Sequence, residues 1–197
     1  MSTDTAIAIA SSGHSRSPAV LLLTRMIHRR IVVAGRTEAN VAGVVDQLRA
    51  AGQSAVEGSY SYAAACDVVC AATRSDTALF GLAQVRPGTH VNLVGSYRLD
   101  LREVAADLVA ASTVVVDEIA AARAEAGDLH LAVQAGVWSW DKVADDLTDL
   151  ASGRLHRRPP HKITLFQTVA LARLDLAMST QPPPPARIRR HSRALPT

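Results

Sequence analysis

Short apolar runs alternate along the chain with longer segments rich in alanine and leucine. The apolar runs predict strands at residues 6–10, 31–34, 68–72, 89–94 and 113–116, and a weaker one at 54–57. Several of these runs are apolar throughout, which is typical of strands that are covered on both faces. Strand–helix alternation with short connections therefore predicts an α/β fold with a doubly wound parallel sheet.

The segments between the strands predict helices. At residues 37–51, Thr37 can cap the helix start, four apolar residues form one face, and Gly52 ends the helix. Further helical or apolar segments are expected at 19–27, 101–111, 119–125, 141–151 and 164–178. The strand pattern fades after Asp117, so we expect C-terminal helices to complete the fold.

Composition is that of a globular protein, with 48% hydrophobic and 20% charged residues. No stretch approaches the roughly 20 apolar residues of a membrane span, and the N-terminus lacks the basic start of a signal peptide. The net charge of +3 arises from four arginines within residues 181–197, a proline-rich tail that we expect to be disordered. We therefore expect a cytoplasmic protein without a membrane or nucleic-acid partner.

Cysteine and histidine positions give no sign of a metal site. Cys66 and Cys70 lie four residues apart with no histidine beside them, so we expect buried apolar thiols. His90 lies inside a predicted strand, where a structural role is expected, and Asp117 can cap the helix that follows it. No catalytic residue is predicted from these side chains.

Three stretches carry a resemblance to a known family. Residues 66–104 begin CDVVCAATRSD and end VGSYRLDLREV, residues 112–133 read STVVVDEIAAARAEAGDLHLAV, and residues 162–177 read KITLFQTVALARLDLA. In order and spacing they resemble the ornithine cyclodeaminase/mu-crystallin family, from about residue 31 to residue 178. The resemblance implies a Rossmann fold that binds NAD(P), a homodimer, and activity on small imino or amino acids.

The resemblance also implies a division of the chain. Residues 1–155 correspond to the dinucleotide-binding Rossmann domain, 156–180 to the C-terminal helix of the family's second domain, and 181–197 to the disordered tail. The family's substrate domain, with the Lys and Arg that bind the substrate carboxylate, is expected to be absent here. The sheet face near Phe166 and Leu171 should then be uncovered, or covered by self-association.

The phosphate loop of the family reads roughly Gly-x-Gly-x-Gln-Ala, and residues 11–16 of this chain read SSGHSR. One glycine, Gly13, is kept after the first predicted strand. Ser12, Gly13 and His14 are therefore expected to bind the pyrophosphate of the cofactor.

Arg36, Thr37 and Asn40 follow the second predicted strand and match the mu-crystallin pattern there. A guanidinium and a helix N-terminus both bind phosphate, so we expect these residues to bind the 2′-phosphate of NADP(H) and to favour it over NAD(H). A solvated Arg36, with Thr37 serving only as a helix cap, is the alternative.

Four further candidates lie at the ends of predicted strands, directly after them, or at the start of the last predicted helix: Thr73, Val94, Gly95 and Thr168. Ligands bind at the carboxyl edge of such sheets, so the resemblance implies cofactor contacts here. A simple turn at Thr73 and a plain strand terminator at Gly95 are the alternatives. The family's Phe-Lys-Ser near the nicotinamide is Phe166-Gln167-Thr168 in this chain, and Phe166 is expected in the core.

Residues 97–100 bear on the reaction. Ornithine cyclodeaminases carry an acid where Tyr97 stands, whereas Arg98 and Asp100 match mu-crystallin. The resemblance therefore favours an NAD(P)-dependent oxidoreductase that reduces cyclic imines or ketimines, or dehydrogenates amino acids. A truncated, non-catalytic NADP-binding or dimerisation module and an ornithine cyclodeaminase are the alternatives.

Overall fold

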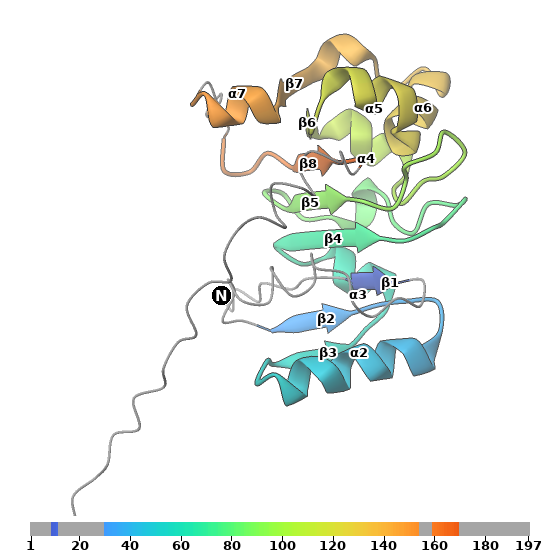
Figure 1. Ribbon diagram of the computed structural model, residues 1–197, viewed down its shortest axis with the longest axis vertical. Coiled ribbons are helices and arrows are strands. Elements are labelled where there is room, and N and C mark those ends of the chain that lie inside the picture. The colour runs from blue at the N-terminus through green and yellow to red at the C-terminus, as the bar shows by residue number, and fades with distance from the viewer. Residues whose placement is uncertain (1–8, 12–29, 154–158, 170–197) are drawn as a thin grey trace, which may run out of the picture.

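The computed structural model describes residues 9–11, 30–153 and 159–169 of the chain (Figure 1). The strands are β1 (Ile9–Ser11), β2 (Ile31–Val33), β3 (Ala55–Glu57), β4 (Val68–Ala72), β5 (His90–Leu93), β6 (Thr113–Val116), β7 (Val143–Asp146) and β8 (Thr164–Gln167). The helices are α2 (Glu38–Ala50), α3 (Tyr60–Ala64), α4 (Ala106–Ala111), α5 (Ile119–Glu125), α6 (Gly127–Gln134) and α7 (Leu147–Ala151), with short 3-10 turns η1 (Leu82–Gln84) and η2 (Trp140–Lys142). The expectations for residues 6–8, 19–27, 170–178 and 181–197 lie outside the described residues.

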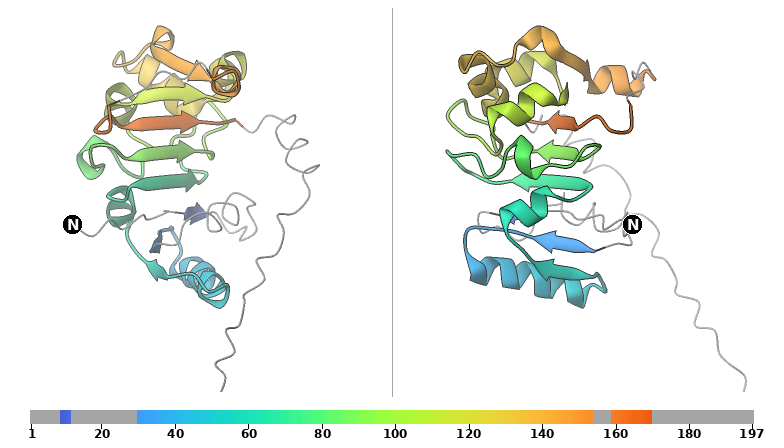
Figure 2. Two further views of the ribbon diagram at one scale, coloured as in Figure 1. Left: turned by 90° about the vertical axis from the view of Figure 1, so that its left-hand side faces the viewer. Right: turned by 180° about the vertical axis from the view of Figure 1, so that it is seen from behind.

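Two parallel ladders build the sheet. Six strands hydrogen-bond in the order β1-β4-β5-β8-β6-β7, and every pairing is parallel. β2 and β3 form a second parallel ladder, which lies beside β1 (Figure 1). α2 lies on one side of the sheet, whereas α3 and α4 lie on the opposite side (Figure 2). The predicted doubly wound parallel sheet is confirmed.

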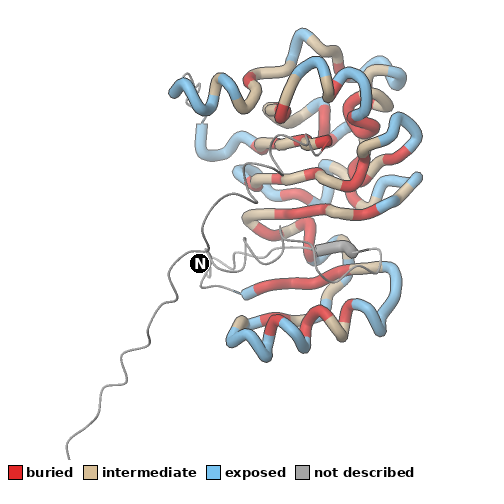
Figure 3. Tube along the Cα trace, in the orientation of Figure 1, coloured by how far each residue is buried: buried red, intermediate tan, exposed pale blue. Residues whose placement is uncertain are grey.

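The core consists of small aliphatic side chains on the inner strands. Val69, Val91 and Leu165 are fully buried in the larger of two clusters, and a smaller cluster packs α2 against β2 and β3. Figure 3 shows buried residues along the strands and exposed residues in the turns and on the outer side of α2. Cys66 and Cys70 are both buried, as predicted. No helix among the described residues is long and apolar enough to cross a membrane.

The structure corrects the start of the helix predicted at residues 164–178. Thr164–Gln167 form β8, an inner strand that pairs with both β5 and β6. Leu165 and Gln167 are fully buried, whereas Phe166, which was expected in the core, is half-buried. The two flanking ladders outweigh the helical preference of the alanine- and leucine-rich sequence that follows. β8 therefore belongs to the sheet, although it lies beyond residue 155.

Two other predicted helices are shorter in the structure. Within residues 141–151, the end of η2 and the strand β7 come first, and the Asp146 carboxylate then caps the short helix α7. Within residues 101–111, α4 begins only at Ala106, because the backbone before it pairs in extended form with residues 79–80: Leu79 N–H donates to the Glu103 carbonyl and Ala105 N–H to the Phe80 carbonyl, both at 2.9 Å. A side-chain cap thus sets the start of α7, and backbone pairing sets the start of α4.

Candidate functional site

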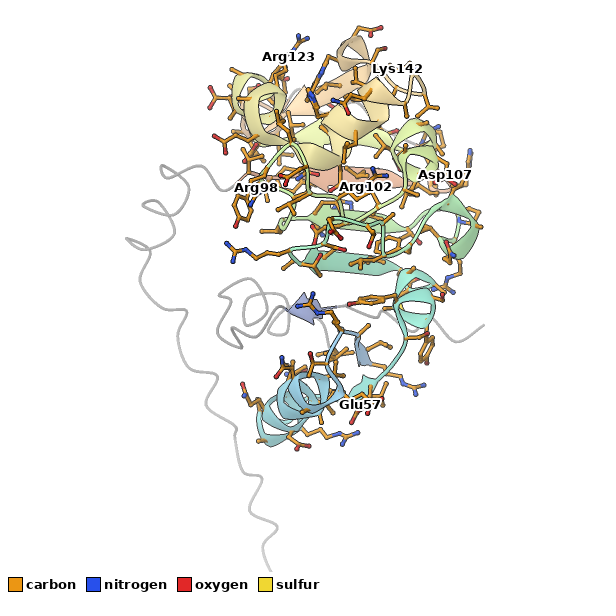
Figure 4. The ribbon with its side chains drawn as sticks, turned by 90° about the vertical axis from the view of Figure 1, so that its right-hand side faces the viewer. Glu57, Arg98, Arg102, Asp107, Arg123 and Lys142 are labelled. Atoms are coloured by element: carbon orange, nitrogen blue, oxygen red, sulfur yellow. The ribbon has the colours of Figure 1, made fainter. Side chains whose placement is uncertain are left out.

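The carboxyl ends of the parallel strands gather at one edge of the sheet. Figure 4 views the molecule from this edge, with Glu57 at the end of β3 and with Arg98 and Arg102 after β5. Ligands of open parallel sheets bind at this edge. The predicted residues that the structure describes lie in or next to the turns after β2, β4, β5 and β8: Arg36, Thr37, Asn40, Thr73, Val94, Gly95 and Thr168. The predicted phosphate loop, residues 12–14, lies outside the described part of the chain.

The turn from β2 to α2 brings three of the predicted residues together. Arg36, Thr37 and Asn40 are all exposed, and Thr37 occupies the N-cap position of α2. The Thr37 carbonyl accepts hydrogen bonds from the backbone N–H groups of Asn40 and Val41, both at 3.1 Å, but its side chain makes no capping bond. A guanidinium, a hydroxyl and a helix N-terminus therefore face solvent at one place, which suits an anionic group.

A buried glutamate ties the ends of β4 and β5 together. The Glu103 side chain is fully buried, and its Oε1 accepts hydrogen bonds from the backbone N–H of Thr73 and from the Thr73 hydroxyl, the latter at 2.7 Å. Its Oε2 accepts from the backbone N–H groups of Val94 at 3.1 Å and Gly95 at 2.8 Å. Burial raises the pKa of Glu103, and these hydrogen bonds oppose that rise. Thr73 is therefore a partner of Glu103, and its cofactor contact stays a prediction.

Gly95 is required by the packing of the protein itself. A Cβ at this position would lie 1.8 Å from the Thr73 carbonyl oxygen and 2.6 Å from Glu103 Oε1. No side chain fits there, because the loops after β4 and β5 touch at this point. The glycine is thus explained without a ligand, and the cofactor contacts of Val94 and Gly95 rest on their position at the edge.

A second buried carboxyl holds the loop that carries Glu103. Asp128, in the first turn of α6, accepts hydrogen bonds at Oδ1 from the backbone N–H groups of Glu103 at 2.8 Å and Val104 at 2.9 Å. Its Oδ2 accepts from the Ser96 hydroxyl, and the Gln167 side chain donates to the same hydroxyl at 3.1 Å. Burial raises the pKa of Asp128 to about 7, and the nearby Glu103 charge adds to the rise.

Asp117 binds the end of β8 instead of capping α5. Its Oδ2 accepts from the Thr168 hydroxyl at 2.8 Å and from the backbone N–H of Val169 at 2.9 Å, and its Oδ1 accepts from Glu118. The N-cap of α5 is Glu118, so the predicted cap at Asp117 is wrong. The carboxylate turns toward β8 because a buried N–H group there needs an acceptor. The cofactor contact of Thr168 stays a prediction.

Arginine and tyrosine side chains form the exposed rim of the loops after β4 and β5. The Arg74 guanidinium lies 5.7 Å from the centre of the Tyr97 ring, and its Nε donates to the Tyr97 hydroxyl at 2.9 Å. Arg98 donates two hydrogen bonds to Asp100, at 3.0 and 2.5 Å, which lower the pKa of that carboxyl. The Arg98–Asp100 pair is exposed, so it contributes little to stability.

His90 has the structural role that was predicted. Its Nδ1 lies 2.7 Å from the Thr164 hydroxyl and its Nε2 lies 3.2 Å from Asn92 Oδ1, so the ring joins β5 to β8. Burial lowers the pKa of His90, which favours the neutral ring.

Sequence reasoning missed Glu103 and Asp128. The sequence carries little signal for them, because other charged residues lie within four positions of each: Arg102 and Asp107 near Glu103, and Glu125 near Asp128. The partners of these carboxyls lie between 8 and 32 residues away along the chain, so no local pattern shows the pairing. The need for glycine at position 127 also emerges only from the structure, because a Cβ there would lie 2.1 Å from the Leu101 carbonyl oxygen.

The sequence has relatives of known activity. The profile of the ornithine cyclodeaminase/mu-crystallin family matches residues 4–181. A Δ1-pyrroline-2-carboxylate reductase from Paracoccus denitrificans is 33% identical over 144 residues, which cover 73% of this chain and 42% of that protein. The chain spans less than half the length of the curated relatives it matches.

Solved structures share the fold. The Thermococcus litoralis Δ1-pyrroline-2-carboxylate reductase, in complex with NADH and L-proline, matches with a TM-score of 0.77 at 22% identity, over 86% of this chain and 54% of that one. The Paracoccus denitrificans iminosuccinate reductase, in complex with NAD+, matches with a TM-score of 0.79 at 20% identity, over 89% and 55%. Because the family profile covers most of its length, this chain belongs to the ornithine cyclodeaminase/mu-crystallin family.

Proposed function

We propose that the protein binds a nicotinamide dinucleotide at the carboxyl edge of its sheet and acts as an NAD(P)-dependent oxidoreductase on small imino or amino acids. The observation that carries this proposal is the 33% identity over 144 residues to a Δ1-pyrroline-2-carboxylate reductase. Two reductases of the same fold have been solved with NADH or NAD+ bound, which supports a cofactor of this class.

The adenosine half of the cofactor is assigned to the turn from β2 to α2. Arg36 and Thr37 are exposed there beside the N-terminus of a 13-residue helix. A 2′-phosphate carries nearly two negative charges, and an exposed guanidinium can bind it through two parallel hydrogen bonds. We therefore propose that NADP(H) is preferred over NAD(H), with Asn40 as a further donor.

The nicotinamide half is assigned to the loops after β4, β5 and β8. Thr73, Val94, Gly95 and Thr168 lie in these loops and are the proposed contacts. The bound cofactor supplies the hydride chemistry, and the residues of this chain bind and orient it. Ser12, Gly13 and His14 are the proposed pyrophosphate contacts.

Cofactor titration and a turnover assay test the proposal together. NADPH and NADH fluorescence should change on binding, with the smaller dissociation constant for NADPH. Oxidation of NADPH is then followed with Δ1-pyrroline-2-carboxylate, and with a linear ketimine as a second substrate. If neither NADPH nor NADH bound, the proposal would be contradicted.

Dinucleotide binding without turnover is the second candidate function. The observation that favours it is that Arg36 and Thr37 are exposed, whereas the Thr73 and Thr168 hydroxyls already bind Glu103 and Asp117 within the protein. Tight NADPH binding with no oxidation of NADPH by any imine, and no conversion of ornithine, would select this candidate. Turnover of a cyclic imine would exclude it.

We further propose that the protein is a cytoplasmic homodimer. An archaeal alanine dehydrogenase of the same fold, solved as a dimer with bound NAD, supports the dimer. Light scattering of the purified chain tests the dimer, and cell fractionation tests the location.

A further inference from the structure

We propose that Glu103 is a positioning residue for the nicotinamide half of the site, a role that rests on the dinucleotide binding proposed above. Its carboxylate fixes the two loops, after β4 and after β5, that would face this half of the cofactor. Glu103 is not itself a proposed cofactor contact. It acts by holding Thr73, Val94 and Gly95, which are.

The first support is how the carboxylate is shared. Oε1 accepts both hydrogen bonds from Thr73, and Oε2 accepts those from Val94 and Gly95. Each oxygen of this fully buried side chain thus serves one loop, and the Val94 N–H also donates to the Ala71 carbonyl at 3.0 Å. No second acceptor for the backbone N–H groups of Thr73 and Gly95 is provided by the neighbouring strands in the described residues.

The second support is that Glu103 is itself held in place. Its backbone N–H and that of Val104 donate to the buried carboxyl of Asp128, while the carbonyl of Glu103 accepts from Leu79 at 2.9 Å. The loop that carries Glu103 is therefore held by Asp128 and by Leu79, and the Glu103 side chain extends from it to the ends of β4 and β5. A carboxylate supported in this way holds its partners more firmly than a mobile surface side chain does.

The third support is the tight fit at the junction. The loops after β4 and β5 approach so closely that only a glycine fits at position 95. Neither loop can be displaced alone, because each is joined to the same carboxylate. The edge that these loops present is set by Glu103, whereas no hydrogen bond joins Glu103 to the turn from β2 to α2 in the described residues.

Glu103→Gln separates the two halves of the site. The Gln side chain keeps the volume of Glu but has an NH2 group in place of one acceptor oxygen. This group cannot accept from the N–H donors that it faces, so one of the two loops loses its hydrogen bonds to residue 103. We expect NADPH binding to weaken by roughly tenfold or more, while 2′,5′-ADP, which carries only the adenosine half, binds as it does to the wild type. Glu125→Gln, an exposed change of the same charge on α5, is the matched control and should alter neither affinity.

Two further measurements keep the test decisive. Glu103→Asp keeps the charge but is one methylene shorter, and it should show the same split between NADPH and 2′,5′-ADP. In the wild type, NMR should show the amide resonances of Thr73, Val94 and Gly95 shifting with NADPH and not with 2′,5′-ADP. Equal weakening of both ligands by the variants, or silent amides in the wild type, overturns the positioning role. Failure of the wild type to bind NADPH overturns the proposed function, and the positioning role with it.

Discussion

Arg36 is the residue on which the proposed cofactor choice depends most. It is exposed at the end of β2, beside the N-terminus of α2. A charge-assisted hydrogen bond contributes roughly 1.5–3 kcal/mol, which corresponds to about 10- to 150-fold in affinity. Arg36→Ala should weaken NADPH binding by about that factor and leave NADH binding nearly unchanged, as measured by cofactor fluorescence. Equal losses for both cofactors, or tighter NADH binding by the wild type, would contradict the assignment.

Two glycines give opposite predictions for the same substitution. Gly95→Ala places a methyl group against the Thr73 backbone, so the free energy of unfolding should fall by about 3 kcal/mol. Gly43 lies inside α2 with nothing within 4 Å of its Cβ position, so Gly43→Ala should raise that free energy by about 0.5–1 kcal/mol. Urea denaturation measures both. A neutral Gly95→Ala would mean that the loops after β4 and β5 do not pack as described.

At the scale of single elements, the sequence predicts structure wherever the pattern is local. The residues of β2 are an apolar run, and the residues of α2 carry an apolar face, so both elements and the exposed Arg36–Thr37 turn between them follow from the sequence. β8 does not follow, because its identity depends on β5 and β6 lying on either side of it. The role of Glu103 could not be predicted for the same reason, because its partner Thr73 is 30 residues away.

The place of β8 inside the sheet can be tested by substitution. Leu165 is fully buried on this strand, and Leu165→Ala should lower the free energy of unfolding by about 2–5 kcal/mol. Leu150, on α7, is 43% exposed, so Leu150→Ala should change the free energy of unfolding by no more than about 0.5 kcal/mol. Chemical denaturation of both variants decides the question, since similar small effects would place residues 164–167 outside the core.

At the scale of the whole molecule, one arrangement joins the fold to the candidate site. Parallel strands put their carboxyl ends at one edge, and three buried carboxyls, Glu103, Asp117 and Asp128, fix the loops that leave this edge. Together they bind backbone N–H groups or hydroxyls next to β4, β5 and β8. The rigidity of the site and the stability of the protein therefore depend on the same few groups.

This dependence predicts how global stability changes with pH. The pKa of Asp128 is raised from 3.8 to about 7 by burial, so the folded protein holds a proton on this carboxyl that the unfolded chain releases. The resulting stability is fully present below the unfolded pKa values and is lost as pH rises through the folded values. For Asp128, the free energy of unfolding should therefore fall between about pH 4 and pH 8. The fall can reach about 4 kcal/mol, because each pKa unit corresponds to about 1.36 kcal/mol.

Asp128→Asn should remove this part of the pH dependence. The Asn carbonyl oxygen can keep the bonds from the Glu103 and Val104 backbones, and its NH2 group can donate to the Ser96 hydroxyl. Relative to the wild type, the variant should then be more stable at pH 8 than at pH 5. Asp46→Asn removes the same charge from the exposed side of α2, so the difference between the two variants isolates the buried carboxyl. Urea denaturation at the two pH values measures the effect. Parallel pH profiles for the wild type and Asp128→Asn would show that Asp128 is already ionised in the folded protein at pH 5.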